Sequence, residues 1–558
     1  MTNSLTHAKP SRAVADITRE DVRNRLLRRA DWRFLLPNPK PIKTICFAAG
    51  LLAKAAALIS EHTVDNRLDV SAHCDLAIAI DPDDTRLQKA WDALRPGGSF
   101  YTEWYSPLAG GSKGVRRRLE ASGFEEVTCY WPWPWPSLFR SRFWLPLDAP
   151  MALHYFQSNR LRVRAILSRI GTAVHQAPWL LSLGMGLTLP ICAIARKAAL
   201  STALSSAPVR RKLRTVTGLR DTLDTKADLL DTIRAGWNRW GFGPTPDHLS
   251  WLLLTGGPRS GSKVVGLVFA EREPRPRLAV KMSRVPESVP ALAREAAALR
   301  AVQSLYPGGM QGVPRVLFCH EHASLMTLGE TALTGPPLWT FLRPDNYRDI
   351  ALKATTWLAD LVGQPEPSPR AHWWNRLIKP VIEDFRESFG PVLDPGMLRE
   401  TEGILDMLGT LPLVCEHRDF SPWNLLVAPD GDLLVLDWES AELQGLPAMD
   451  LIYFLTYLAF YVSGAWRLRR FRKSYRATLD PSTLTGSVLR ECMARYISHI
   501  GLDATALRPL RLLTWMLHSR SEYRHFIADV AGKPGREILR RSLFVELWEE
   551  ELRHASRI

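Results

Sequence analysis

The sequence predicts an α/β N-terminal domain followed by an α+β C-terminal domain. In the first part, short apolar segments alternate with amphipathic helices, which is the pattern of a mainly parallel sheet covered by helices. A stretch rich in Ala, Ser and basic residues at 197–214 then precedes a β-hairpin and a long series of helices. The expected boundaries are an N-terminal extension at 1–40, the α/β domain at 41–200, a connection at 201–240 and two C-terminal parts at 241–335 and 336–558.

The elements of the first part follow from its apolar runs. Residues 42–50 (IKTICFAAG) and 74–81 (CDLAIAID) are short apolar segments that predict buried strands. Residues 84–98 predict an amphipathic helix that stops at Pro-Gly-Gly, and 99–104 predict the next strand. Residues 114–131 predict a helix, a glycine stop and a further strand.

The second part has fewer strands. Residues 262–284 predict a β-hairpin with a Pro-rich turn, and 290–305 predict a helix with Pro290 near its first turn. From about residue 346 the pattern is mostly helical. It is interrupted at 425–438 by two apolar strands, joined by a Pro-Asp-Gly-Asp turn that favours a hairpin.

Composition limits the class of protein. Hydrophobic residues make up 46% and charged residues 23%, which is typical of a globular protein with a buried core and excludes disorder as the dominant state. The formal net charge of +15 favours anionic partners, with a solvated basic surface as the alternative. Nucleic-acid binding is not predicted, because zinc fingers, RNP-like aromatic motifs and long lysine tracts are missing.

Cysteine usage and apolar segments predict a cytoplasmic location. The seven cysteines are scattered without a Cys-x-x-Cys pair, which favours a reducing compartment over a disulfide framework or zinc site. The first 29 residues lack the apolar core of a secretory signal. The stretches 179–195 and 451–466 are at or below the shortest length of a membrane span, so we expect buried elements.

The octet His-Arg-Asp-Phe-Ser-Pro-Trp-Asn at 417–424 carries the strongest chemical signal. Phosphoryl transfer needs a carboxylate for the acceptor hydroxyl and oxygen ligands that hold Mg²⁺ against the phosphates. Asp419 suits the first task, and Asn424 and Asp437 suit the second. A single carboxylate could be a surface or capping residue, but this ordered set around a short hairpin is much more specific.

Residues 415–455 resemble the aminoglycoside phosphotransferase and choline-kinase-like family of small-molecule kinases, which are related in fold to protein kinases. The resemblance implies a bilobal, protein-kinase-like domain with its N-lobe at 241–335 and its helical C-lobe at 336–558. It implies Asp419 as catalytic base and Asn424 and Asp437 as Mg²⁺ ligands. It also implies that Asp450 orders the catalytic loop, and that His417 supports the loop and Asp437 by hydrogen bonding.

The same resemblance implies an ATP site upstream. Lys281, which ends the apolar strand "LAVK", matches the lysine that grips the α- and β-phosphates, with a surface lysine as the alternative. Glu295 is its better expected partner and Glu287 the poorer one. The segment 255–269 is expected to cover the phosphates through Gly257, Gly261 and Ser262, or to be a plain turn. Backbone atoms near Met326–Gly329 are expected to meet adenine.

The acceptor is predicted to be a small hydroxylated molecule. Ser421 stands where a protein kinase usually has lysine, and the short run 438–449 leaves little chain for a peptide-docking platform. The basic segment 466–476 has three open interpretations: a solvated helical face, a site for an anionic acceptor, or contact with an acidic membrane surface. Further basic residues follow at Arg508, Arg511, Arg520 and Arg524.

The first part resembles the later half of a class I S-adenosylmethionine-dependent methyltransferase, in the pattern of 74–104 and 119–131. It lacks that family's Gly-x-Gly-x-Gly turn, since "CFAAGLLAK" offers only Gly50. We therefore expect a shortened Rossmann-like domain without cofactor, used for packing or acceptor recognition. The Trp-Pro repeat at 131–136 is expected to pack between elements or to line an acceptor groove.

Taken together, these patterns predict an ATP·Mg²⁺-dependent phosphotransferase acting on a hydroxyl of a small molecule. One alternative is a pseudokinase or scaffold that binds nucleotide or a partner without turnover, and the complete Asp–Asn–Asp set counts against it. The other is a bifunctional kinase and methyltransferase, and the missing glycine turn counts against it.

Overall fold

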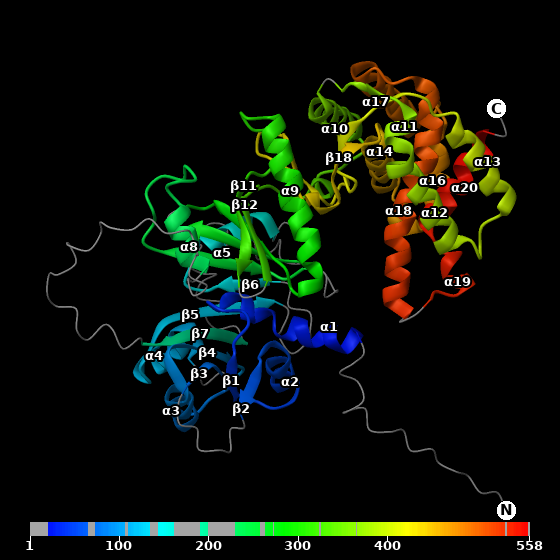
Figure 1. Cartoon of the computed structure of the whole chain (residues 1–558). Coiled ribbons are helices and arrows are strands. Elements are labelled where there is room, and N and C mark those ends of the chain that lie inside the picture. The colour runs from blue at the N-terminus through cyan, green and yellow to red at the C-terminus, as the bar shows by residue number, and fades with distance from the viewer. Residues whose placement is uncertain are drawn as a thin grey trace, which may run out of the picture. The chain divides into compact units, whose positions relative to one another are not determined.

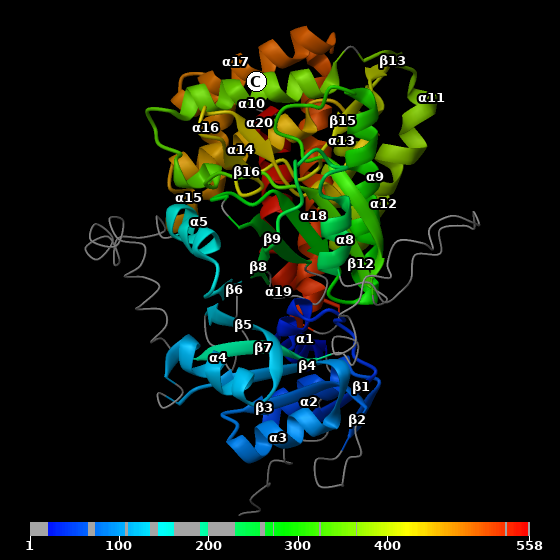
Figure 2. The same cartoon turned by 90° about the vertical axis from the view of Figure 1, so that its left-hand side faces the viewer.

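The computed structural model describes residues 20–64, 73–106, 110–133, 143–160, 190–198, 229–256, 263–271, 273–322, 325–363, 365–530 and 533–555. The chain divides into two compact units (Figures 1 and 2). Unit 1 comprises the chain up to Leu292 together with Val316–Ala332. Unit 2 comprises Ala293–Arg315 and Leu333–Ile558.

Unit 1 is built on one 12-stranded sheet, in the order β11-β12-β10-β9-β8-β6-β5-β7-β4-β3-β1-β2. The strands are β1 (Lys43–Cys46), β2 (His62–Val64), β3 (Cys74–Ile80), β4 (Leu94–Trp104), β5 (Phe124–Trp133), β6 (Phe143–Pro146), β7 (Ile191–Lys197), β8 (Leu249–Leu254), β9 (Val264–Ala270), β10 (Leu278–Met282), β11 (Val316–His322) and β12 (Leu325–Thr331). The sheet continues across the connection predicted at 201–240, because β6 pairs with β8. The predicted hairpin of 262–284 is confirmed by the antiparallel pairing of β9 with β10.

The sheet is only partly parallel, which corrects the expectation of a mainly parallel sheet. Strands β2, β1, β3 and β4 pair in parallel. The change occurs at β7, which lies between β4 and β5 and runs antiparallel to both (Figure 2). This strand contains the end of the apolar stretch 179–195, so its described part is a buried element, as predicted. Residues 179–189 lie outside the described residues.

Helices cover both faces of this sheet. Helices α3 (Asp84–Ala93), α4 (Gly111–Ala121) and α5 (Pro150–Arg160) share one apolar cluster with the sheet. The opposite cluster contains residues of α1 (Glu20–Arg29), the 3-10 helix η1 (Asp31–Leu35), α2 (Gly50–Ile59) and α8 (Leu229–Gly236). Along β3, Ala77 and Ala79 belong to the first cluster and Leu76 and Ile78 to the second, as the twofold repeat of a strand requires. The resemblance of 41–200 to a methyltransferase, and its predicted lack of cofactor, stay predictions.

A buried ion pair ties the N-terminal segment to the chain that follows β10. The guanidinium of Arg284 donates to both carboxylate oxygens of Asp31, at 2.9 and 3.1 Å, and both side chains are fully buried. Arg33 donates to the carbonyl of Arg284. Arg29 pairs with buried Glu103 on β4 at 2.6 Å. The described part of the predicted N-terminal extension is therefore an integral part of the core of unit 1.

Unit 2 is mostly helical, as predicted. Its helices include most of α9 (Val289–Leu305), then α10 (Tyr347–Val362), α12 (Lys379–Phe389), α13 (Pro395–Asp406), α14 (Met449–Val462), α16 (Phe471–Leu479), α17 (Leu484–Ile500), α18 (Leu507–Val530) and α20 (Leu543–Ala555). Helix α14 packs against α10, α16, α17 and α18, and its residues 449–460 are buried. This confirms that the apolar stretch beginning at 451 is a core element. Within the described residues, no helix has the combination of length and apolarity needed to cross a bilayer.

The ion pair between Asp31 and Arg284 should dominate the stability that the N-terminal segment contributes. Asp31→Ala leaves the Arg284 guanidinium buried without its carboxylate, so we expect the free energy of unfolding of unit 1 to fall by about 3–5 kcal/mol. Arg23→Ala breaks the exposed pair with Glu287 and is the matched control, with an expected loss below about 1 kcal/mol. Denaturant unfolding followed by tryptophan fluorescence measures both values, and equal losses would contradict the expectation.

Candidate active site

The octet at 417–424 lies in a loop whose two ends are held by short strands of unit 2. Strand β15 (Val414–Glu416) leads into the loop and pairs with β18 (Glu442–Gly445). Strands β16 (Leu425–Val427) and β17 (Leu433–Val435) follow as an antiparallel hairpin, which confirms the predicted turn. The N–H of Leu436 donates to the carbonyl of Asn424 at 2.9 Å. The hairpin therefore returns Asp437 to the end of the loop.

Asp419 and Asn424 are in direct contact. The Asn424 amide nitrogen Nδ2 donates to Oδ2 of Asp419 at 2.7 Å and to the Asp419 carbonyl at 2.9 Å. These bonds orient the carboxylate, and they leave Oδ1 of Asn424 as the side-chain atom suited to a metal. The spacing of five residues in the motif is thus the spacing at which one amide can hold the side chain and main chain of Asp419 together.

Asp450 holds the start of the loop. It lies in the first turn of α14, where its carboxylate accepts the N–H of His417 at 2.6 Å and that of Arg418 at 2.8 Å. Burial, and next the charge of Glu416, raise the pKa of Asp450 to about 8, while the two N–H donors act in the opposite direction. The Arg418 guanidinium donates to Glu416 at 3.0 Å and so places a positive charge beside these two carboxyl groups.

His417 connects the two sides of the site. Its Nδ1 accepts the N–H of Asp419 at 3.3 Å, so Nε2 carries the hydrogen and donates to the carbonyl of Leu436 at 3.0 Å. The ring is fully buried and packs edge-to-face on Trp438 at 4.8 Å. These contacts agree with a supporting role for His417, since each of them fixes the backbone next to Asp419 or Asp437.

Three carboxylates gather behind the loop. Glu295, Asp437 and Glu439 each offer an oxygen, and these oxygens lie within 4.8 Å of one another. Glu295 also accepts the N–H of Trp438 at 3.1 Å, and the positive φ of 70° at Asp437 turns the chain there. Grouped carboxylates repel unless a cation neutralises them, so this donor set fits Mg²⁺. Glu439 was not predicted, although its place two residues after Asp437 in "DWES" was the available signal.

Lys281 is buried in unit 1. Its ammonium group contacts Glu330 of β12 at 2.8 Å, and both side chains are almost fully shielded from solvent. The alternative of a surface lysine is therefore wrong. Glu330 was missed because it approaches Lys281 across neighbouring strands, far away in the sequence. Glu287 pairs with Arg23. Glu295 belongs to unit 2, so its pairing with Lys281 stays a prediction.

The expected nucleotide contacts stay predictions. Met326 lies in β12, and its backbone N–H and C=O both bond to Ser283, at 2.8 and 2.9 Å. The contact of adenine with backbone atoms near Met326–Gly329 is not tested by these bonds. Gly257, Gly261 and Ser262 lie outside the described residues. A hollow of about 420 Å³ on unit 2 is lined by Lys353, Trp357 and Asp432 among others, but by none of the motif residues.

Removal of the Asp450 carboxylate should open the start of the loop. Asp450→Ala deprives the N–H groups of His417 and Arg418 of their acceptors, so we expect their amide hydrogen exchange to accelerate by about 10- to 100-fold. Asp406→Ala, which removes an exposed carboxylate paired with Arg370, is the control that should leave this exchange unchanged. Unchanged protection in Asp450→Ala would show that other contacts hold the loop.

Known proteins resemble this part of the chain. Residues 267–482 match the Phosphotransferase enzyme family. No curated protein matches the chain.

Among solved structures, an aminoglycoside phosphotransferase of Streptomyces rimosus in complex with ADP and streptomycin is 18% identical, with 46% of this chain and 90% of that chain covered and a TM-score of 0.32. The choline kinase LicA of Streptococcus pneumoniae is 12% identical, with coverages of 53% and 90% and a TM-score of 0.32. The family match places the resemblance in the C-terminal part of the chain, and the matched residues include each predicted site residue from Lys281 to Asp450.

Proposed function

We propose that the protein is an ATP·Mg²⁺-dependent phosphotransferase that acts on a hydroxyl group of a small molecule. The observation that carries the proposal is the joint arrangement at the β16–β17 hairpin. The Asp419–Asn424 pair precedes the first strand and Asp437 follows the second. The bond from the Leu436 N–H to the Asn424 carbonyl brings both to the same open end of the hairpin, where Asp437 groups with Glu295 and Glu439. The family match over the same residues supports the same chemistry.

Asp419 is the proposed base. A carboxylate fixed by the Asn424 amide can accept or orient the proton of an acceptor hydroxyl. The pair is itself held in place, because His417 accepts the N–H of Asp419 while Asp450 accepts the N–H groups of His417 and Arg418. Asp419 is therefore already held in its position before the acceptor binds.

Asn424, Asp437 and Glu439 are the proposed metal ligands. When bound, Mg²⁺ would offset the charge of the nucleotide phosphates. Glu295 would support this group through its bond to the N–H of Trp438, which fixes the backbone between the two other carboxylates. The assignment of Lys281 to the phosphates, and of ATP as the nucleotide, stays part of the proposal.

The acceptor is proposed to be small. Residues 438–449 are taken up by a 3-10 helix at Trp438–Ser440, strand β18 and the first turn of α14, which leaves no length for a peptide platform. Ser421 is fully buried, so this position does not present a side chain to an acceptor as the protein-kinase lysine does. The anionic character of the acceptor stays a prediction. A pseudokinase remains the alternative, and it differs from the proposal in a measurable way.

Loss of Asp419 should abolish turnover but not folding. We expect Asp419→Ala to lower kcat by about 10²- to 10⁴-fold, because a positioned base contributes that factor to proton transfer. The measurement is ATP-dependent phosphorylation across a panel of hydroxylated metabolites, followed by kinetics on the best acceptor. Asp349→Ala removes an exposed carboxylate of α10 and serves as the control. Transfer that persists in Asp419→Ala would refute the assignment, and nucleotide binding by the wild type without any turnover would favour the pseudokinase.

The carboxylate group should set the metal requirement. Glu439→Gln removes one charge from the proposed site, so we expect the Mg²⁺ concentration for half-maximal activity to rise by about 10- to 100-fold. Asp437→Asn should abolish activity at any Mg²⁺ concentration tested. Glu442→Gln alters a nearby carboxylate that pairs with Arg376 and should leave the requirement unchanged. An unchanged Mg²⁺ dependence in Glu439→Gln would remove Glu439 from the ligand set.

A further inference from the structure

The basic segment, residues 466–476 of unit 2, begins in the link between α14 and α16 and continues into α16. It contains part of the short helix α15 (Ala465–Leu468) and the first two turns of α16. The run 465–479 contains no acidic residue. The sequence left open whether its cations form a solvated face or a binding surface, and the structure divides them into two groups.

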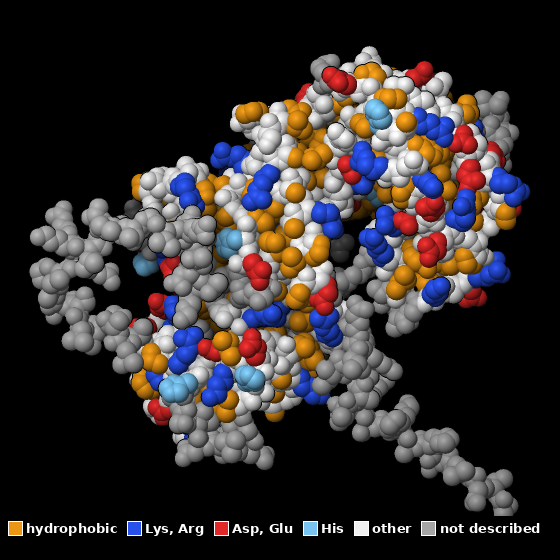
Figure 3. Space-filling view, in the orientation of Figure 1, with side chains coloured by type: hydrophobic (Ala, Val, Ile, Leu, Met, Phe, Trp, Pro, Cys, Tyr) orange, Lys and Arg blue, Asp and Glu red, His pale blue; other side chains and the backbone are white. Residues whose placement is uncertain are grey.

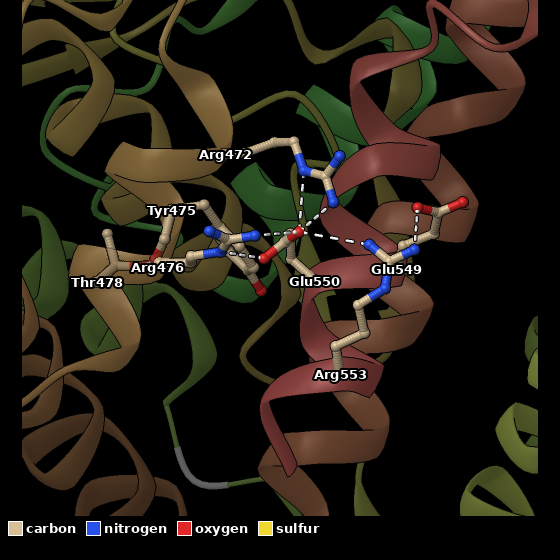
Figure 4. A network of polar contacts seen from close by, with 7 residues as sticks. All are labelled: Arg472, Tyr475, Arg476, Thr478, Glu549, Glu550 and Arg553. Atoms are coloured by element: carbon tan, nitrogen blue, oxygen red, sulfur yellow. Dashed lines mark hydrogen bonds and ion pairs between the residues drawn. The ribbon is translucent and has the colours of Figure 1, made fainter. Parts of the chain in front are cut away.

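The first group is used inside the unit. Arg472 and Arg476 both donate to Glu550 of α20, at 2.9 and 3.0 Å for two of these bonds, and Arg553 lies on the other side of the same carboxylate (Figure 4). Burial acts against ionisation of Glu550, but hydrogen bonds from Arg476 and Arg472 lower its pKa to about 2. These arginines attach α16 to α20 and are not offered to a partner.

The second group faces solvent. Arg467, Arg469, Arg470 and Lys473 are exposed, and within the described part of the chain none of the four pairs with an acidic side chain. Two large apolar side chains are interleaved with them, since Trp466 is 43% exposed and Leu468 is 47% exposed. By contrast, basic and acidic side chains are interspersed over the face of unit 2 that Figure 3 shows. The basic segment therefore combines a single sign of charge with exposed apolar surface.

The backbone at Arg469 adds to this contrast. Its φ of +50° places it in the left-handed region, which favours glycine. The position ends α15, where glycine is the usual residue. Glycine at this position would suit the backbone and would remove one of the exposed cations.

The basic segment lies close to the catalytic loop through aromatic contacts. Trp466 packs on Tyr457 of α14, with ring centroids 5.7 Å apart. Tyr457 in turn packs on Trp423, next to Asn424, at 5.0 Å. Two ring contacts thus separate the exposed Trp466 from the loop that carries Asp419. A partner bound at the basic segment would lie beside the proposed reaction centre.

We propose that the basic segment docks unit 2 onto the surface of an anionic phospholipid bilayer. Arginine and lysine side chains bind the negative headgroups, while a tryptophan and a leucine enter the interface between headgroups and acyl chains. A soluble anion would use the cations alone and would leave Trp466 and Leu468 in water. If the proposed phosphotransferase function also holds, docking presents the catalytic loop to hydroxyl groups of amphiphilic molecules at the bilayer surface.

Liposome binding by the full-length protein tests the proposal without requiring turnover. We expect co-sedimentation with vesicles of phosphatidylcholine and phosphatidylserine but not with phosphatidylcholine alone, and a decline as salt is added. Substitution of Arg467, Arg470 and Lys473 by glutamine should weaken binding by about fivefold for each cation removed. Leu468→Ser should weaken it further. Arg469→Gly should raise the melting temperature and still weaken binding, which separates docking from folding.

The matched control is the triple substitution of Arg536, Arg540 and Arg541 by glutamine. It removes the same number of exposed cations from unit 2 and lowers the net charge of +15 equally. Equal weakening in both triple variants would overturn the proposal, because it would show non-specific attraction. Binding to inorganic phosphate or to an oligonucleotide that competes fully with the vesicles would also overturn it. Liposome binding with no kinase activity would leave docking intact and reject only the proposed function.

Discussion

The candidate site depends on one carboxylate, that of Asp450, which accepts two consecutive backbone N–H groups from the loop of residues 417–424. This loop lies outside the strands and helices, so its backbone groups cannot pair within a strand or helix. Asp450 replaces that pairing from the first turn of α14, a helix whose residues 449–460 are buried. His417 restrains the backbone at two further points, because its ring bonds to the N–H of Asp419 and to the carbonyl of Leu436. The packing of the core thus fixes the backbone beside Asp419 and Asp437.

The hairpin between Asn424 and Asp437 brings two groups of polar side chains together. Its strands are only three residues each, and the bond from Leu436 to Asn424 closes it one residue beyond the strand pairs. Asn424, which holds Asp419, therefore lies at the same open end of the hairpin as Asp437 with its neighbouring carboxylates. At α16, Arg472 and Arg476 join two helices through Glu550, whereas the neighbouring Arg470 and Lys473 are exposed.

In unit 1, a single sheet joins residues 41–200 to residues after 240, which the sequence pattern predicted to lie in separate domains. Apolar side chains alternate between the two faces from β3 through to β10, so both core clusters continue across the β6–β8 pairing. The N-terminal segment closes one of these faces, and its Asp31 neutralises Arg284, three residues after Lys281. A buried charge requires a partner at that place, so the N-terminal segment and the loop after β10 are structurally coupled.

Local pattern was sufficient for the elements and for the ordered motif. Apolar periodicity and turn residues predicted β3, the two hairpins and α9. The ordered motif pointed to Asp419, Asn424 and Asp437, and the family resemblance implied Asp450, before any contact was known. Tertiary structure alone decided contacts between residues far apart in sequence. These include the pairing of Lys281 with Glu330, the approach of Glu295 to Asp437, the insertion of β7 between β4 and β5, and the division of the basic residues near 470. Strand order and ion pairing depend on which segments meet in space, and periodicity along one segment contains no information about its neighbours.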